Sequence, residues 1–155
     1  MKKLAVLTLS LSSLLGSPAL GNYGTHEVSG NVMIVGNDNG GLVYDRIREV
    51  KRLIADKIEI RVTGRHCYSS CTLYLRSPYT CVAPYTKFGF HGPSLSGKPL
   101  EPEAADMWRQ AIAAHYPAPL AKWYLSGPAE LLVRHRVILG RNLEEHGIKI
   151  CDNQN

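Results

Sequence analysis

A serine and a histidine that each follow a short apolar stretch are the residues of this chain best suited to chemistry. Ser69 lies within Cys-Tyr-Ser-Ser-Cys, and His91 ends the sequence Phe-Gly-Phe-His. A serine hydroxyl attacks a carbonyl carbon when an imidazole within hydrogen-bond reach takes up its proton. Gly40 and Gly41 supply a third component, because backbone without Cβ atoms can approach a substrate and direct N–H groups at an oxyanion. The residue types therefore predict acyl-transfer chemistry.

The segment around Ser69 fits this chemistry because a strand is expected to end there and a short helix, residues 72–76, to follow. Free N–H groups at a helix start favour negative charge, so the Ser70 N–H can donate to the same oxyanion. A serine at a helix start is also a common cap, and a histidine after a strand often has only a structural role. The order of the three motifs, each after a separate predicted strand, favours a site.

The elements that must position these residues begin with a βαβ unit. Residues 32–35 form a continuous apolar run bounded by glycines, which is typical of a buried strand, and alternation over 58–62 indicates a second strand. Between them, apolar side chains at helical spacing over 43–54 predict an amphipathic helix. Such a unit is expected to be parallel and right-handed, which makes the fold class α/β.

The rest of the chain is predicted to add short strands and a helical C-terminal portion. A surface loop rich in Gly, Pro and Ser is expected over 92–102, where it could border a site. Two strands are predicted before this loop, over 80–83 and 87–91, and one near the C-terminus, over 148–151. The helices predicted in the C-terminal portion span 103–116, 128–134 and 142–146.

The first 21 residues have the composition of an export signal. Lys2 and Lys3 precede an apolar run over 4–15, and small residues stand before the expected cleavage point. A retained anchor is the alternative, but a bilayer-spanning helix needs roughly 20 apolar residues. Residues 22–155 are then predicted to be one periplasmic or secreted domain that has no membrane association once the signal is removed.

The charges of the chain argue against a role in nucleic-acid binding. Removal of Lys2 and Lys3 with the signal lowers the formal net charge from +5 to +3. The remaining basic residues are scattered, without a basic run or interleaved aromatic residues. The positive charge gives only a weak preference for anionic partners.

Four cysteines lie in the part of the chain that is expected to be exported. An even number in an oxidising compartment argues for disulfides, and four cysteines allow three pairings. Cys67 and Cys71 could face each other across one helical turn, while Cys81 and Cys151 each lie in a strand-like stretch. This favours the pairs 67–71 and 81–151. A cysteine nucleophile is an alternative, and so is zinc, although His66 beside Cys67 matches no common zinc spacing; no metal or cofactor is predicted.

The three motifs together resemble the Clp protease/crotonase superfamily, and in particular its small secreted ClpP-like branch. The resemblance covers residues 32–91, with a weaker match over 129–131 and 147–151. In that family one strand leads into a Pro-Gly-Gly-like turn, matched here by 38–41. A second leads into a Cys-Ala-Ser-Ala-Cys-like turn, matched by 67–71, and a third ends in an apolar-Gly-apolar-His sequence, matched by 88–91.

The resemblance implies a ClpP/crotonase-like spiral of βαβ units and a peptidase-like serine hydrolase. It assigns Ser69 as nucleophile, His91 as general base, and the N–H groups of Gly41 and Ser70 as the oxyanion hole. It further implies a peptide or protein substrate. Since relatives often form trimers or larger rings, it also allows a homo-oligomer.

Two departures from the family pattern support an alternative function. Asn39 replaces the proline before Gly-Gly, and residues 133–141 contain no carboxylate that could orient His91. The remaining candidates for that carboxylate are Glu101, Glu103, Asp106 and Glu130. The alternative is a catalytically inactive, disulfide-stapled protein that binds a peptide or protein partner, using some of its tyrosine and tryptophan side chains.

Overall fold

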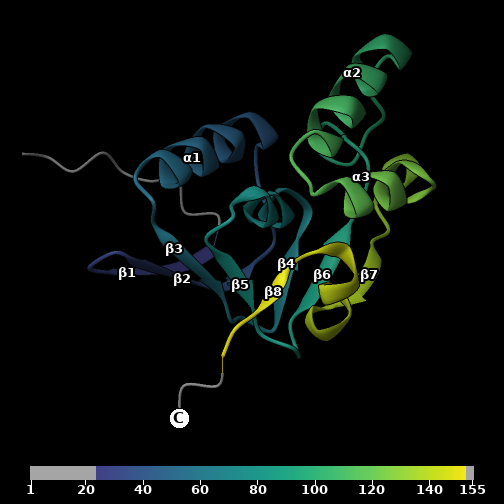
Figure 1. The fold of residues 1–155 in the computed structure, drawn as a ribbon. Helices are drawn as coiled ribbons and strands as arrows, with labels where there is room; N and C mark the ends of the chain where they lie inside the picture. Colours follow the sequence, from purple (N-terminus) through teal and green to yellow (C-terminus); the bar gives the residue numbers. More distant parts are fainter. Residues whose placement is uncertain (1–23, 153–155) are drawn as a thin grey trace, which may run out of the picture.

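A curled, mostly parallel sheet flanked by helices forms the centre of the protein (Figure 1). The computed structural model describes residues 24–152, so the signal predicted over 1–21 lies outside the described residues. The mixed α/β architecture predicted from the sequence is confirmed. None of the helices within 24–152 has both the length and the apolar character needed to cross a membrane.

The strands are arranged in the order β7-β6-β4-β2-β3-β5-β8, and β1 pairs with β2 outside this path. From β6 to β8 all neighbours in this order are parallel, whereas β1 and β7 pair antiparallel with β2 and β6. The strands span β1 Gly24–Ser29, β2 Val32–Asp38, β3 Glu59–Val62, β4 His66–Tyr68, β5 Thr80–Val82, β6 Lys87–Phe90, β7 Arg136–Leu139 and β8 Lys149–Ile150.

The helices flank the sheet, and the first of them turns the apolar side chains predicted from the sequence toward the core. The helices span α1 Val43–Ala55, α2 Pro102–Ala113 and α3 Ala118–Leu125, and the 3-10 helices span η1 Ser69–Arg76, η2 Pro128–Glu130, η3 Gly140–Asn142 and η4 Glu144–His146. α1 connects the parallel strands β2 and β3, which confirms the predicted βαβ unit. It buries Val50 and Leu53 and packs against η1.

The core lies between the sheet and these helices. Val35, Ile60 and Val82, from the adjacent strands β2, β3 and β5, are all completely buried. On the other side of the sheet centre, β6 buries Phe88 and Phe90. Truncation of one large side chain in such a core costs about 2–5 kcal/mol. These contacts fix the strand ends from which the site is built.

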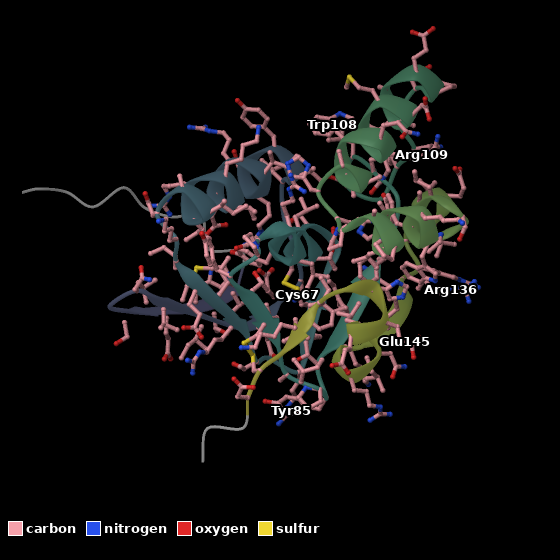
Figure 2. All side chains as sticks on the ribbon, viewed as in Figure 1. Cys67, Tyr85, Trp108, Arg109, Arg136 and Glu145 are labelled. Atoms are coloured by element: carbon pink, nitrogen blue, oxygen red, sulfur yellow. A yellow bond between two sulfur atoms is a disulfide. The ribbon has the colours of Figure 1, made fainter. Side chains whose placement is uncertain are left out.

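Both predicted disulfides are confirmed. Cys67 is bonded to Cys71 across a separation of 4 residues, and Cys81 is bonded to Cys151 across a separation of 70 residues. The first pair lies inside the protein, where Cys67 is completely buried (Figure 2). The second joins β5 to the residue after β8, so it ties the C-terminal segment to the sheet.

Two parts of the fold differ from the sequence prediction. A helix forms over Ala118–Leu125, between the helices predicted over 103–116 and 128–134. Pro117 is the N-cap and Pro119 lies in the first turn, where a helix needs no N–H donor. The helix predicted over 128–134 is wrong, because only Pro128–Glu130 is helical and the chain then extends into β7.

Candidate active site

The three predicted motifs follow three neighbouring parallel strands. β2, β4 and β6 are adjacent in the sheet, with Asp38 paired to Cys67 and Cys67 paired to Phe88. Parallel strands in register end at one edge of a sheet, about 4.8 Å apart from neighbour to neighbour. This edge is where open α/β sheets bind ligands. The register therefore brings the glycine pair, Ser69 and His91 to one place.

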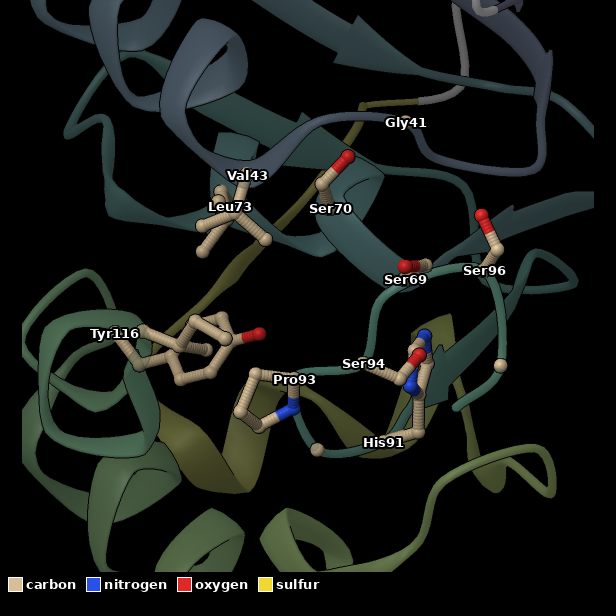
Figure 3. A pocket seen from close by; sticks show the side chains of 13 residues that line it. Gly41, Val43, Ser69, Ser70, Leu73, His91, Pro93, Ser94, Ser96 and Tyr116 are labelled. Atoms are coloured by element: carbon tan, nitrogen blue, oxygen red, sulfur yellow. The ribbon is translucent and has the colours of Figure 1, made fainter. Parts of the chain in front are cut away.

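A pocket of about 200 Å³ opens at this edge. Figure 3 shows the polar residues Ser69, Ser94, Ser96 and His91 on one side and an apolar group on the other. The lining contains all four residues predicted for the site, Gly41, Ser69, Ser70 and His91. The loop predicted to border the site also contributes, through Pro93, Ser94, Ser96 and Gly97.

Ser69 has an unusual backbone conformation. Its φ is +55°, a region that non-glycine residues rarely adopt and that costs of order 1–3 kcal/mol. It is the first residue of η1, whose N-cap is Tyr68 and whose N-terminus has no side-chain capping hydrogen bond. The Thr72 hydroxyl donates to the Ser69 carbonyl oxygen at 2.7 Å, which fixes the turn. A strained serine at a strand-to-helix corner is typical of a nucleophile rather than of a helix cap.

The glycine pair packs directly against this turn. Gly40 has a φ of +89°, and a Cβ atom there would lie 2.6 Å from the Cβ of Ser69 and 2.9 Å from the Ser70 nitrogen. Only glycine allows this approach. The N–H groups of Gly41 and Ser70 donate to no turn, loop or side-chain acceptor within residues 24–152. They are therefore free to donate to a ligand in the pocket.

Asp38 holds the glycine loop in place, a role that turn chemistry alone did not reveal. Its side chain is completely buried, and its Oδ1 accepts a hydrogen bond from the Gly40 N–H at 2.7 Å. Its Oδ2 lies 2.8 Å from Nη2 of Arg46 and 3.2 Å from Nε2 of His26. The sequence contained a sign of this role. Arg46 lies on the apolar face of the predicted helix, and a buried arginine needs an acidic partner such as Asp38. His26 lies in β1, the strand that pairs antiparallel with β2.

The network continues from Arg46 toward η1. Nη1 of Arg46 is 3.0 Å from Oε2 of Glu49 and also donates to the Tyr74 hydroxyl, which in turn donates to Glu49 at 3.0 Å. Burial raises the pKa of Tyr74, so this side chain stays protonated. Charges buried this deeply are tolerated only when each has partners. The network therefore locks α1, β2 and η1 beneath the pocket.

His91 is held in place by hydrogen bonds of its backbone and of the next residue. Its carbonyl oxygen accepts a hydrogen bond from the Tyr124 hydroxyl at 3.1 Å, and the next N–H, of Gly92, donates to the Leu131 carbonyl at 2.6 Å. Nδ1 is buried and has no hydrogen-bond partner within the described part of the chain. Burial, and then the nearby His135, lower the pKa of His91 below 6.5. The ring is therefore neutral at neutral pH and can accept a proton.

None of the carboxylates considered from the sequence lines the pocket. Glu130 is 65% exposed and pairs with Arg109 at 3.1 Å, and Asp106 lies 3.9 Å from the same guanidinium. Beside His91 there is instead the ring of His135, whose centroid is 5.0 Å away at an interplanar angle of 85°. His135 lies just before β7, one position after the end of the helix predicted over 128–134.

Because of the two disulfides, no cysteine thiol is available as a nucleophile at the site. All four cysteines are paired, so no thiol flanks Ser69. In residues 24–152, no three His, Cys, Asp or Glu side chains are grouped so that they could hold a metal ion. The polar groups of the pocket are thus hydroxyls, backbone N–H groups and one imidazole.

Comparison with known proteins adds no family assignment. No protein-family model matches the chain, and no curated protein sequence is significantly similar to it. The function is therefore inferred from the geometry of the pocket, with the sequence resemblance as a hypothesis beside it.

Proposed function

We propose that the protein is an exported serine hydrolase of peptidase-like type, with Ser69 and His91 as a catalytic dyad. The observation that carries the proposal is the convergence, in one pocket, of a backbone-strained serine, a neutral imidazole and two free N–H groups. Because these come from successive turns of neighbouring parallel strands, the arrangement also supports a ClpP/crotonase-like spiral as the finer fold class.

The proposed reaction begins with attack of Ser69 Oγ on a carbonyl carbon. His91 takes the hydroxyl proton as the new C–O bond forms, and the oxyanion accepts hydrogen bonds from the N–H groups of Gly41 and Ser70. Collapse breaks the bond to the leaving group, which receives the proton from His91. Water then attacks the acyl-enzyme and gives a proton to His91, which returns it to Ser69.

The absence of a carboxylate from the pocket lining sets an expectation for the rate. In serine proteases the acid orients the histidine and stabilises the imidazolium, and its replacement lowers kcat by about 10⁴. The N–H groups of an oxyanion hole still supply substantial stabilisation without it. We therefore propose a slow hydrolase.

The pocket favours an uncharged acyl group. Its apolar half is formed by side chains from α1, η1, the loop after β6 and the α2 region, namely Val43, Leu73, Pro93, Ile112 and Tyr116. The Tyr116 hydroxyl is already hydrogen-bonded to the Thr72 hydroxyl at 2.6 Å. Among the described residues, no charged side chain lines the pocket, so a charged group would lose its hydration without a partner. An apolar side chain of a peptide substrate fits these surroundings best.

Export to the periplasm or the exterior is part of the proposal. Two disulfides, one of which closes a separation of 70 residues, are typical of proteins that fold in oxidising compartments. Neither nucleic acid nor a membrane is proposed as a partner. A homo-oligomer stays a prediction from the family resemblance.

The decisive experiment is labelling by a fluorophosphonate that carries an uncharged alkyl chain. We expect one covalent adduct, located on Ser69 by mass spectrometry of the oxidised protein. Ser69→Ala should lose the adduct and keep the thermal unfolding transition. Ser94→Ala, which changes another pocket hydroxyl, is the matched control and should keep the adduct. An adduct that persists in Ser69→Ala would refute the assignment of the nucleophile.

The unpaired Nδ1 of His91 favours one alternative function, a catalytically inactive binding protein. Without an acid, the site could hold a peptide in the apolar half and not cleave it. Folded wild-type protein that takes up no label, but binds short apolar peptides with an affinity reduced by Ile112→Asp, would support this alternative.

A further inference from the structure

Four rings form a row that ends at His91. His66 and Tyr68 of β4 lie with ring centroids 4.8 Å apart, and Tyr68 stacks on His135 at 4.9 Å and 24°. His135 then meets His91 nearly at right angles, with centroids 5.0 Å apart. Edge-to-face and stacked contacts at these separations are favourable and fix ring planes. The row therefore connects β4, the segment before β7 and the end of β6.

A strand glycine makes room for this row. A Cβ atom on Gly89 would lie 2.6 Å from Cδ1 of Tyr68 and 3.1 Å from both Cβ and Cγ of His135. Any other residue in this central part of β6 would push the two rings away. The glycine two positions before His91 thus has a specific consequence, since it allows His135 to approach the imidazole.

We propose that His135 is a positioning residue for the dyad, in which its ring fixes the orientation of the His91 imidazole and its charge controls whether His91 carries a proton. The inference rests on the proposed function, because it concerns the base of that reaction. His135 contacts the His91 ring, and no carboxylate of the described residues lines the pocket.

The tyrosine side chains near His91 stay neutral, so His135 is the neighbour whose charge can act on it. From α3, Tyr124 reaches only the His91 carbonyl, and after α2, Tyr116 lines the pocket; burial raises the pKa of both phenols, so they stay neutral. From η1 comes the neutral hydroxyl of Ser69. His135 is the titratable side chain that lowers the pKa of His91, after the larger effect of burial.

The two histidines protonate in a defined order. His135 is exposed, as are its neighbours Arg134 and Arg136, whereas His91 is only partly exposed. Burial lowers the pKa of His135 too, but this ring has more access to water and takes the first proton as the pH falls. His91 must then protonate beside a positive charge. His91 consequently stays neutral, and able to act as a base, at a lower pH than a histidine held by a carboxylate.

The test follows the His91 imidazole directly by NMR titration in wild type and in three variants. His135→Phe keeps a ring in the row and removes the charge, so the pKa of His91 should rise by about 0.5 unit or more. His135→Gln removes both ring and charge and should also raise the pKa. His146→Phe changes a histidine of η4 that contacts Trp123 and should leave the pKa of His91 unchanged.

The fluorophosphonate labelling rate separates orientation from charge. At pH 8, His135→Phe should label as fast as wild type, and His135→Gln at least several-fold more slowly. At pH 5.5, His135→Phe should fall behind wild type because more of its His91 is protonated. An unchanged pKa of His91 in both His135 variants would overturn the inference even if Ser69 labels. A raised pKa in a protein that does not label would uphold the control of charge and refute the hydrolase instead.

Discussion

At the scale of single residues, the positive φ of Ser69 supports the proposed role as nucleophile over that of an ordinary helix cap. Its φ of +55° is held by the Cys67–Cys71 disulfide, by the Thr72 hydroxyl and by the backbone of Gly40. Strain of this kind persists only where the surroundings enforce it, and it is commonest at functional sites. Its conformation therefore carries a cost of about 1–3 kcal/mol relative to an unstrained backbone.

Relief of this strain gives a prediction. Ser69→Gly should raise the free energy of unfolding by about 1 kcal/mol, because glycine adopts positive φ without steric cost. The same variant should lose fluorophosphonate labelling. Urea unfolding measures the first effect. Ser94→Gly is the control: Ser94 has no positive φ, so glycine there should lower stability. Destabilisation by Ser69→Gly would show that the turn is not strained.

At the scale of elements, the buried charges of Asp38 and Arg46 join β2 to α1 beneath the pocket. Asp38 accepts a hydrogen bond from the glycine loop with one oxygen and pairs with Arg46 through the other. The two side chains are 0% and 3% exposed, so neither can turn to water for compensation. The elements that carry the proposed oxyanion donors are therefore positioned by electrostatics as well as by apolar packing.

Replacing the charged side chain of Asp38 should lower the stability of the protein and disturb the pocket. Asp38→Asn keeps the shape but leaves Arg46 short of a counter-charge, so we expect a loss of about 3 kcal/mol in the free energy of unfolding. Labelling of Ser69 should also slow under conditions where the variant is folded. Glu59→Gln, which breaks the more exposed pair with Arg61 at 2.6 Å, should cost less than about 1 kcal/mol. Equal losses in the two variants would contradict the proposed role.

At the scale of the whole molecule, the stability should depend on the two histidines at the pocket. Burial is the largest cause that lowers the pKa values of His91 and His135 below 6.5 in the folded protein. In the unfolded chain these values return to their ordinary range, so the unfolded state binds more protons as the pH falls. The folded state is then favoured most where both rings are neutral.

Urea unfolding between about pH 7.5 and 5.5 tests this dependence. The free energy of unfolding should be constant above the ordinary histidine pKa of 6.5 and fall as the pH decreases below it. His91→Gln should make the fall shallower, because it removes one of the two groups. A stability that rises on acidification through this range, or a slope unaffected by the substitution, would show that His91 is not held neutral by the fold.

The sequence by itself determined the features that arise from local patterns. Apolar periodicity predicted α1 and the parallel pair β2–β3, and cysteine spacing predicted both disulfides. Motif order placed Ser69 and His91 among the candidates, because turns between buried strands and helices have characteristic residues. Most of these signals depend on neighbours within about one turn or one strand of each residue. The Cys81–Cys151 pair, 70 residues apart, was instead favoured because the two other cysteines are close enough to pair with each other.

Tertiary structure decided which distant groups meet. The burial of Asp38, the antiparallel pairing of β7 with β6 and the contact between His135 and His91 depend on segments far apart in the chain. No local periodicity encodes such contacts, because they result from how the sheet curls and which side chains then share its edge. That the His135 ring lies beside His91, where no carboxylate lines the pocket, was visible only in the folded chain.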